Sequence, residues 1–322
     1  MNPLVSVVTP FHNTAPYLAE CIESVLAQSY PTFEYILVDN QSTDGGGEIA
    51  ERYARQDARI RFLKTSTLLA QVPNYNNALR HMSPDAIYCK VVQADDWIFP
   101  ACLQEMVTLA EAHPSVDVVS AYELRGANVC GSGGLAYDQK VISGRDACRM
   151  HMLGGVSLFG TPTTLMMRAS AVRAREPFYT EGRYFEDTEA MYEILRERDF
   201  GFVHQVLTFN RVREESIWAK FKPLDPLPLA DLTMASRYGR IYLSDEEFQA
   251  HYARVHDNYF KMLARAWLRR PPATFFDFHR KGLADIGEQL TQAKLARYAV
   301  SALVDEALPT RVAISLGRLR RD

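Results

Sequence analysis

Three apolar segments in the first hundred residues end at polar side chains that could bind a ligand. The first segment ends at Thr9 and Pro10, and the second ends at Asp39. The third is followed by two adjacent acids, Asp95 and Asp96. Because open α/β sheets bind their ligands at the carboxyl ends of their strands, we expect these side chains to meet in one crevice. The pattern predicts a site for a nucleotide and a metal ion.

Asp95 and Asp96 bring two negative charges together at the mouth of the predicted sheet. Neighbouring carboxylates repel one another unless a cation or a hydrogen-bond donor joins them. Mn²⁺ or Mg²⁺ suits such a pair, because these ions take oxygen ligands and complete their shell with phosphate oxygens and water. We predict Asp96 as a direct metal ligand and Asp95 as a partner of the ribose or of a metal-bound water. We also expect metal and nucleotide to tighten each other's binding. The alternative is a pair of solvated turn carboxylates.

Asp39 offers a carboxylate that can accept hydrogen bonds from a uracil N–H or from ribose hydroxyls, and the Thr9 hydroxyl is expected beside it. The alternative is that Asp39 only forms a turn, which aspartate favours. Asp44 has the same two interpretations, since it could instead cap the helix that follows.

Alternating strands and helices are expected to position these residues between residue 4 and about residue 125. Strands are predicted at 4–9, 33–39, 60–64, 86–92 and 116–122, and helices at 15–28, 45–56, 74–82 and 100–112. Such alternation is typical of a mostly parallel sheet covered by helices on both faces. The sequence therefore predicts an α/β fold.

After Arg125 the pattern changes to a loop, a probable helix at 187–198, and a proline-containing linker at 223–228. Amphipathic helices follow to about residue 307. The helix at 246–268 carries an apolar stripe that must be buried, and we expect it to dock on the preceding domain. We predict a catalytic domain at 1–218 and a helical C-terminal extension at 219–322.

Composition excludes several classes of protein. A formal net charge of -3 gives no field that would attract DNA or RNA, so we expect no nucleic-acid partner. Five cysteines without a C-x-x-C pair indicate buried, reduced thiols. No signal peptide and no apolar run of roughly 18 residues is evident, so we expect a cytoplasmic protein. Basic residues near the end of the chain, such as Arg318 and Arg320, make the inner face of the membrane a further expected location.

The order of these motifs resembles the family-two glycosyltransferases, which have the GT-A fold, over roughly residues 3 to 217. The resemblance is carried by residues 9–13, residues 39–44, Asn76 with the following Ala78 and Leu79, the pair Asp95-Asp96, and the pair Glu186-Asp187. It implies a Rossmann-like sheet flanked by helices. It also implies transfer of a sugar, with inversion, from a nucleoside diphosphate donor to a hydroxyl acceptor. A UDP-sugar is the favoured donor, and the expected acceptor is a precursor of a cell-surface polysaccharide, lipopolysaccharide or other glycan, including lipid-linked ones.

Roles for individual residues follow from the same resemblance. It places Asn76 among the donor-binding residues, as it does Thr9, Pro10, Asp39 and Asp95. It makes Asp187 the general base, with Glu186 orienting the acceptor. A sugar hydroxyl is a poor nucleophile until a carboxylate takes its proton. The alternative for this pair is a favourable interaction with a helix dipole.

Three residues depart from the family pattern. Gln93 replaces a frequent leading acid, Tyr75 replaces an arginine before Asn76, and Arg213 stands in place of a histidine. An arginine cannot coordinate a metal, but it can bind diphosphate through charged hydrogen bonds. The alternative role of Arg213 is an ion pair with Glu214 or Glu215. These departures keep a second function open, a catalytically degenerate subunit that binds a nucleotide sugar without turnover.

Overall fold

The computed structural model describes residues 2–131, 135–154, 158–183, 185–213 and 221–307. The chain divides into two compact units, Met1–Glu214 and Glu215–Asp322. The predicted boundary at residue 218 lies outside the described residues. Within the described part of the chain, no helix combines the length and apolar character needed to cross a bilayer.

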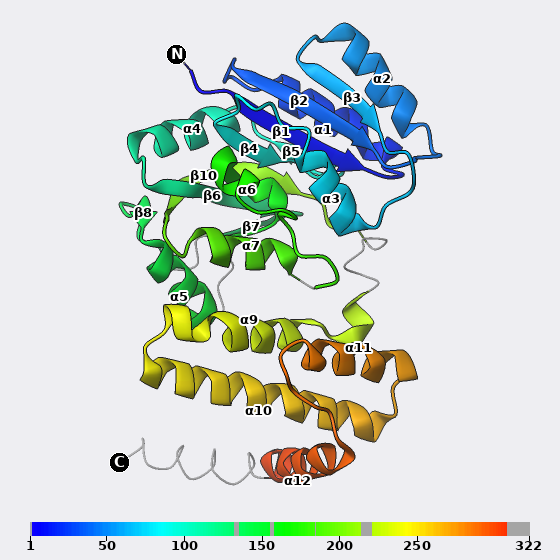
Figure 1. Cartoon of the computed structure of the whole chain (residues 1–322), viewed down its shortest axis with the longest axis vertical. Helices are drawn as coiled ribbons and strands as arrows, with labels where there is room; N and C mark the ends of the chain where they lie inside the picture. The colour runs from blue at the N-terminus through cyan, green and yellow to red at the C-terminus, as the bar shows by residue number, and fades with distance from the viewer. Residues whose placement is uncertain (1, 132–134, 155–157, 184, 214–220, 308–322) are drawn as a thin grey trace. The chain divides into compact units, whose positions relative to one another are not determined.

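The described part of the first unit is built on a ten-stranded sheet (Figure 1). Its strands are β1 (Val5–Phe11), β2 (Phe33–Asp39), β3 (Ile60–Lys64), β4 (Tyr88–Val91), β5 (Trp97–Ile98), β6 (Val116–Arg125), β7 (Asn128–Cys130), β8 (Val141–Ile142), β9 (Met166–Arg168) and β10 (Asp199–Asn210). The order is β3-β2-β1-β4-β9-β6-β10-β5, with β7 beside β6 and β8 beside β10. The longer pairings, β1 with β2 and β4, β2 with β3, and β6 with β10, are parallel. The antiparallel pairings are short, so the predicted α/β class with a mostly parallel sheet is confirmed.

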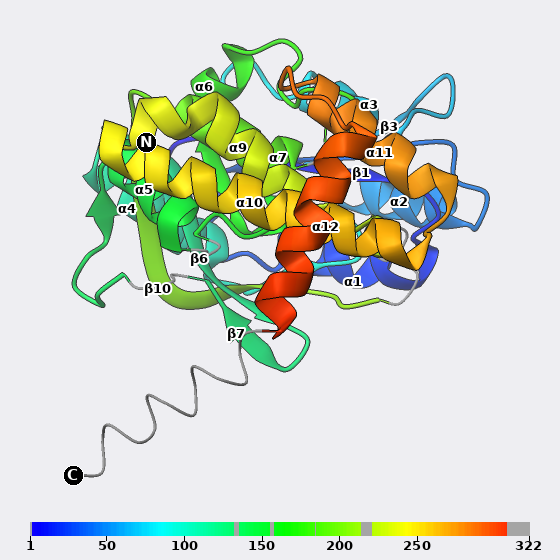
Figure 2. The same ribbon diagram turned by 90° about the horizontal axis from the view of Figure 1, so that it is seen from below.

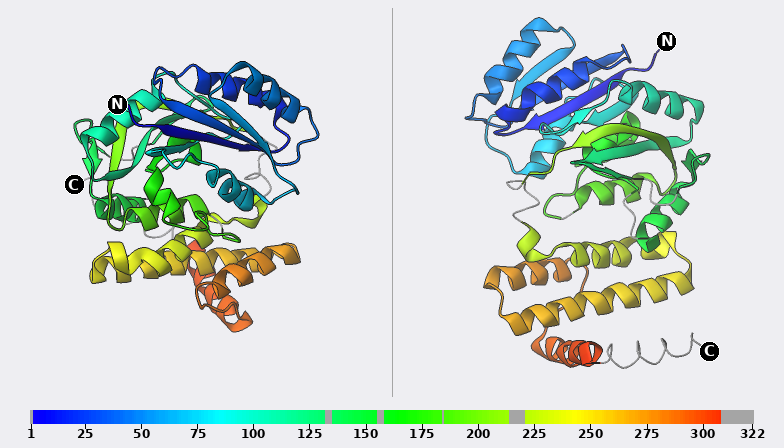
Figure 3. Two further views of the ribbon diagram at one scale, coloured as in Figure 1. Left: turned by 45° about the horizontal axis from the view of Figure 1, so that its top comes forward. Right: turned by 180° about the vertical axis from the view of Figure 1, so that it is seen from behind.

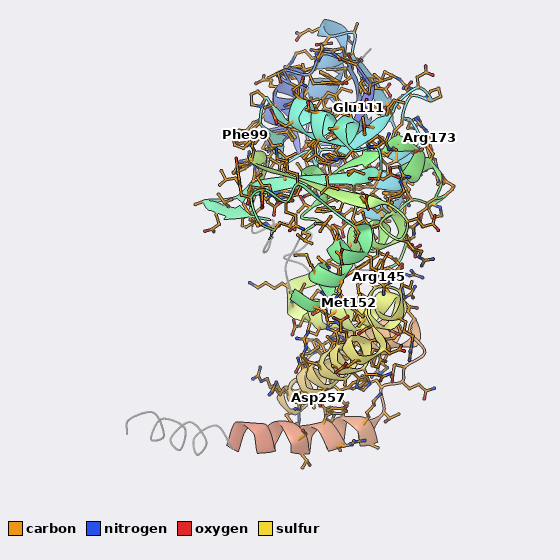
Figure 4. The ribbon with its side chains drawn as sticks, turned by 90° about the vertical axis from the view of Figure 1, so that its left-hand side faces the viewer. Phe99, Glu111, Arg145, Met152, Arg173 and Asp257 are labelled. Carbon is orange, nitrogen blue, oxygen red and sulfur yellow. The ribbon has the colours of Figure 1, made fainter. Side chains whose placement is uncertain are left out.

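Helices cover both faces of this sheet (Figure 3). They are α1 (Ala15–Leu26), α2 (Gly46–Gln56), α3 (Gln71–Leu79), α4 (Cys102–Ala112), α5 (Gly144–Gly154), α6 (Ala169–Arg173) and α7 (Glu186–Ile194), with a 3-10 turn η1 (Pro162–Thr164). Helices α1, α2 and α4 bury their apolar sides in one core with β1 and β2. Helix α3 packs against β1 and β2, and α7 against β6. The side view in Figure 4 labels Glu111 of α4, which accepts a hydrogen bond of 2.6 Å from the Tyr88 hydroxyl of β4.

The predicted elements agree best where the local pattern is long. The predicted strands 33–39 and 60–64 coincide with β2 and β3, and the helix at 45–56 begins one residue late. The helix predicted at 74–82 instead runs from residue 71 to 79, because Pro73 is tolerated in its first turn. Strands β5 and β8 have two residues each, which is too short for a periodic pattern to be visible.

The second unit is helical, as predicted. Its elements are η2 (Lys222–Leu224), α9 (Leu227–Tyr242), α10 (Asp245–Arg269), α11 (Ala273–Ala284) and α12 (Gln292–Ala307). Helix α10 lies between α9 and α12 (Figure 2). The predicted stripe on α10 includes Val255, Tyr259 and Leu263, which are buried in a core formed within this unit. The proline-rich segment is not a simple linker, since it forms η2 and begins α9.

Candidate active site

Asp39 closes the end of β2 opposite Phe11, the last residue of β1. Its side chain is 2% exposed, and Oδ1 accepts a hydrogen bond of 2.8 Å from the backbone N–H of Ser42. The other oxygen, Oδ2, lies 3.9 Å from Lys64 Nζ. A Cβ on Gly47 in the first turn of α2 would lie 2.9 Å from Oδ2, so only a glycine leaves this oxygen its space. The turn that Asp39 was alternatively expected to form is present, and it aims the carboxylate at the start of α2.

Thr9 lies inside the sheet, two residues before the end of β1. Its hydroxyl donates to the carbonyl oxygen of Val92 at 2.8 Å and lies 3.1 Å from the Tyr35 hydroxyl. Pro10 is also buried and lies opposite Val38 of β2. The predicted nucleotide contact of Thr9 does not fit this geometry, because the hydroxyl is already bound within the core. The sequence pattern predicts that this strand ends at residue 9, whereas β1 continues to Phe11.

Asp44 caps helices, which is one of the two roles that the sequence left open for it. Its Oδ2 accepts a hydrogen bond of 2.8 Å from the backbone N–H of Ala15, the first residue of α1. Its Oδ1 accepts one of 3.1 Å from Gly46, the first residue of α2. One carboxylate therefore binds two helix N-termini, where negative charge is favourable.

Asp96 is 3% exposed, and both of its carboxylate oxygens accept hydrogen bonds. Oδ2 accepts from the Thr163 hydroxyl at 2.6 Å and from the Asn210 amide at 3.2 Å. Oδ1 accepts from the backbone N–H of Arg211 at 2.9 Å. Burial and the neighbouring charge of Asp95 raise the pKa of Asp96 to about 7. The carboxylate thus ties η1 and the end of β10 together, which corrects its prediction as a direct metal ligand.

Asp95 forms an ion pair with Arg213, in which Oδ2 lies 2.5 Å from Nη2. The guanidinium carbon of Arg213 also lies 5.1 Å from the centre of the Tyr17 ring, within the range of a cation–π interaction. Glu214 and Glu215, the expected alternative partners of Arg213, lie outside the described residues. The arginine that stands in place of a histidine therefore contacts the acidic motif directly.

The residues around the acidic pair do not fit the predicted Mn²⁺ or Mg²⁺ site. Within the described ranges, no three His, Cys, Asp or Glu side chains are placed to hold a metal ion. Asp96 accepts three protein hydrogen bonds, and Asp95 already pairs with a cation. Such ions need several oxygen ligands. Oδ1 of Asp95 is the single oxygen of this pair without a protein partner among the residues described.

Glu186 and Asp187 begin α7, and both residues are partly buried. Burial and the neighbouring Asp187 raise the pKa of Glu186 to about 7. Burial also raises the pKa of Asp187, although its Oδ1 accepts a hydrogen bond of 2.7 Å from the backbone N–H of Thr188. Carboxylates with raised pKa values are suited to take a proton near neutral pH.

Tyr75 of α3 connects the two acidic pairs. Burial raises the pKa of its hydroxyl, which hydrogen-bonds the side chain of Gln93. The charges of Asp95 and Glu186 raise this pKa further, so the hydroxyl lies within electrostatic reach of both motifs. Sequence reasoning treated Tyr75 and Gln93 as two separate departures. The structure shows that Tyr75 and Gln93 interact with each other. Their joint departure from the family pattern was the sequence signal that could have indicated this interaction.

Asn76 bonds the segment before α7 through both the nitrogen and the oxygen of its side-chain amide. Its Nδ2 donates to the carbonyl oxygen of Tyr179 at 2.8 Å, and its Oδ1 accepts from the N–H of Tyr179 at 2.8 Å. The ring of Tyr179 packs edge-on against Tyr75, with centroids 6.1 Å apart. Asn76 therefore positions the segment that leads to Glu186. A second amide N–H remains for a ligand, so the donor contact of Asn76 stays a prediction.

Asn76→Ala is expected to lower the free energy of unfolding by about 1–3 kcal/mol, because two buried backbone groups lose their partner. We also expect transfer activity to fall, since the segment before Glu186 is released. Urea unfolding followed by circular dichroism measures the first effect. Asn77→Ala is the matched control, because Asn77 makes no side-chain hydrogen bond among the described residues. Equal stability of the two variants would contradict this role for Asn76.

Comparison with known proteins gives consistent matches over the first unit. Residues 6–174 match the sequence model of Glycosyl transferase family 2. EpsE of Bacillus subtilis, named as a candidate glycosyltransferase, is 33% identical over 221 residues, which cover 67% of this chain and 74% of the relative. Glycosyltransferase GlyG of Streptococcus pneumoniae is 27% identical over 229 residues, with 67% and 73% covered.

Solved structures show the same fold. TarS 1-349 of S. aureus in complex with UDP-GlcNAc superimposes with a TM-score of 0.65 at 17% identity, covering 88% of this chain and 80% of that one. The mannosyltransferase PcManGT of Pyrobaculum calidifontis, in complex with GDP-Man and Mn²⁺, gives 0.57 at 16% identity, covering 95% and 88%. The predicted GT-A fold is therefore confirmed.

Proposed function

The chain belongs to glycosyl transferase family 2, and from this premise we propose that it transfers a sugar from a nucleoside diphosphate donor to a hydroxyl acceptor. The observation that carries the proposal is the partly buried pair Glu186-Asp187 at the start of α7, whose raised pKa values suit proton abstraction. The Tyr75 hydroxyl lies within electrostatic reach of both Glu186 and Asp95, and beside Asp95 the side chain of Arg213 offers a cation for the diphosphate. A base and an anion-binding group are the two requirements of such a transfer.

A nucleotide-sugar donor is supported by the ligands of structures that share the fold, which hold UDP-GlcNAc and GDP-Man. We propose that Asp39 binds the base or the ribose, because its carboxylate stands at the end of β2 beside the first turn of α2. A UDP-sugar is favoured, since a carboxylate can accept a hydrogen bond from the N–H of uracil.

The proposed chemistry is a single displacement with inversion. The acceptor oxygen forms a bond to the anomeric carbon while the bond from that carbon to the diphosphate oxygen breaks. The diphosphate leaves with the electron pair, and Asp187 takes the proton of the acceptor hydroxyl. Glu186 is proposed to orient the acceptor. No step is assigned to Mn²⁺ or Mg²⁺, because the residues at Asp95 and Asp96 do not fit such an ion.

All of these residues lie in the first unit. We therefore propose residues 1–218 as the catalytic domain and 219–322 as a helical extension. A hydroxyl of a glycan or of a lipid-linked precursor is the proposed acceptor, since a carboxylate base activates a sugar hydroxyl for attack.

Transfer should rise with pH across neutrality, because the base Asp187 must lose its proton and burial has raised its pKa. Burial and the charge of Asp187 also raise the pKa of the neighbouring Glu186, to about 7. Below this pH the pair Glu186-Asp187 retains a proton and the rate falls. Rates measured across neutrality with a saturating donor test this. Glu186→Gln removes the repulsion between the two acids, so its profile should shift to lower pH. Identical profiles for parent and variant would contradict the assignment.

Thermal stabilisation by nucleotides tests the proposed donor class. A ligand that binds only the folded protein raises the melting temperature. We expect UDP or GDP to do so, and inorganic pyrophosphate to do so less, because Asp39 contributes only when a nucleoside is present. A melting temperature that no nucleotide changes would contradict the proposal.

A further inference from the structure

Arg213 pairs with one oxygen of the Asp95 carboxylate, which was expected to lie at the metal site. Its Nη2 is 2.5 Å from Oδ2 of that carboxylate, which is a close ion pair. A divalent ion on the same carboxylate would sit within a few ångströms of the guanidinium, and the two positive charges would repel each other. In this arrangement Asp95 is already neutralised by the chain's own cation.

One donor of Arg213 is left for a ligand. Nε is buried and has no hydrogen-bond partner among the residues that the structure describes. Buried polar groups almost always have a partner, and the cost is larger for a charged group. The side chain as a whole is 23% exposed, so Arg213 is not sealed from solvent. An incoming anion can supply the missing acceptor.

Arg211, two residues earlier, is fixed by other contacts. Its backbone N–H donates to Oδ1 of Asp96, its Nε donates to the carbonyl oxygen of Asp95 at 2.9 Å, and its guanidinium pairs with Glu20. Arg211 therefore maintains the shape of the segment and has less capacity for a ligand. Arg213 has five N–H donors in a planar fork, which is enough to hold Asp95 and a phosphate oxygen at the same time.

Resting on the proposed function, we propose that Arg213 supplies the positive charge that binds the donor diphosphate, and that this chain binds nucleoside diphosphates and transfers sugar without a divalent metal ion. When the bond between the anomeric carbon and the diphosphate oxygen breaks, the oxygen takes the electron pair. The N–H groups of Arg213 then stabilise the added negative charge. An arginine keeps its proton throughout, so no proton has to be returned.

Titration calorimetry with UDP and GDP, in EDTA and in excess Mn²⁺, tests the proposal. For the parent protein we expect dissociation constants in the two buffers to agree within about threefold. Arg213→Ala should weaken binding more than about tenfold in both buffers, and Arg213→Lys by less, because it retains the charge. Arg55→Ala on the exposed face of α2 is the matched control and should bind as the parent does.

The Arg213→His variant offers a second test, because Mn²⁺ is expected to strengthen nucleotide binding by this variant and not by the parent. An imidazole can coordinate a metal where a guanidinium cannot. This variant should bind UDP weakly in EDTA and recover affinity with Mn²⁺. Circular dichroism and the melting temperature of each variant identify those that fold.

Two results would overturn the proposal. The first is a folded parent protein that binds UDP or GDP only with Mn²⁺. The second is a folded Arg213→Ala variant that equals the parent in EDTA. Both outcomes would leave the proposed glycosyl transfer intact, since nucleotide would still bind. Absence of nucleotide binding by the folded parent in both buffers would overturn the proposed function together with this assignment.

Discussion

Asp187→Asn is expected to lower sugar transfer by about two to four orders of magnitude, the usual contribution of a general base. Asparagine has nearly the same shape and can keep the hydrogen bond that the carboxylate accepts from the N–H of Thr188. It cannot take a proton from the acceptor. The turnover number should therefore fall while UDP affinity stays within about twofold of the parent value.

Glu193→Gln is the matched control for this variant. Glu193 lies on the same helix, α7, and pairs with Arg196. Its neutral analogue should transfer at nearly the parental rate. If Asp187→Asn also transferred normally, Asp187 would have no part in the reaction, and Glu186 would be the next candidate for the base.

Asp96→Ala is expected to lower the free energy of unfolding by about 2–4 kcal/mol, because one buried and two partly buried donors lose their acceptor. These donors are the Thr163 hydroxyl, the Asn210 amide and the backbone N–H of Arg211. Asp95→Ala should cost much less, since Asp95 has one ion pair and is partly exposed. Guanidinium unfolding of both variants measures the difference.

The pH dependence distinguishes this explanation from a simple packing defect. The folded pKa of Asp96, about 7, lies above its unfolded value, so the folded state holds this proton more tightly. The resulting stabilisation is complete below the unfolded pKa and is lost as pH rises through about 7. The gap between the parent and Asp96→Ala should therefore widen on acidification. A gap that is constant with pH would contradict the raised pKa.

The places of the acidic residues relative to strands and helices were predictable, while their roles in a site stay predictions. Asp39 and the pair Asp95-Asp96 follow apolar runs directly, and the parallel order of β3, β2 and β1 makes such strand ends converge. Glu186 and Asp187 were identified by their place in a family pattern. What these local signals could not give is the direction in which each carboxylate points.

The direction of each side chain depends on bonding partners that are far away in the sequence. Asp96 turns inward because Thr163 and Asn210 reach it from η1 and the end of β10. Asn76 faces the backbone of Tyr179, which bonds both ends of its amide. No periodicity encodes such pairings, since they arise only when distant segments pack together. The departures from the family pattern were the better guide, because Arg213 proved to contact an acid of the site.

Release of nucleoside diphosphate tests the central claim most directly. Purified full-length protein would be incubated with a panel of UDP- and GDP-sugars, with and without simple sugar acceptors, and the released UDP or GDP would be quantified. We predict that the parent protein releases UDP or GDP from at least one donor. The release should be faster when an acceptor is present, and the Asp187→Asn variant should release much less. Tight binding of a nucleotide sugar without any release by the parent would contradict it, and would identify a binding subunit without turnover instead.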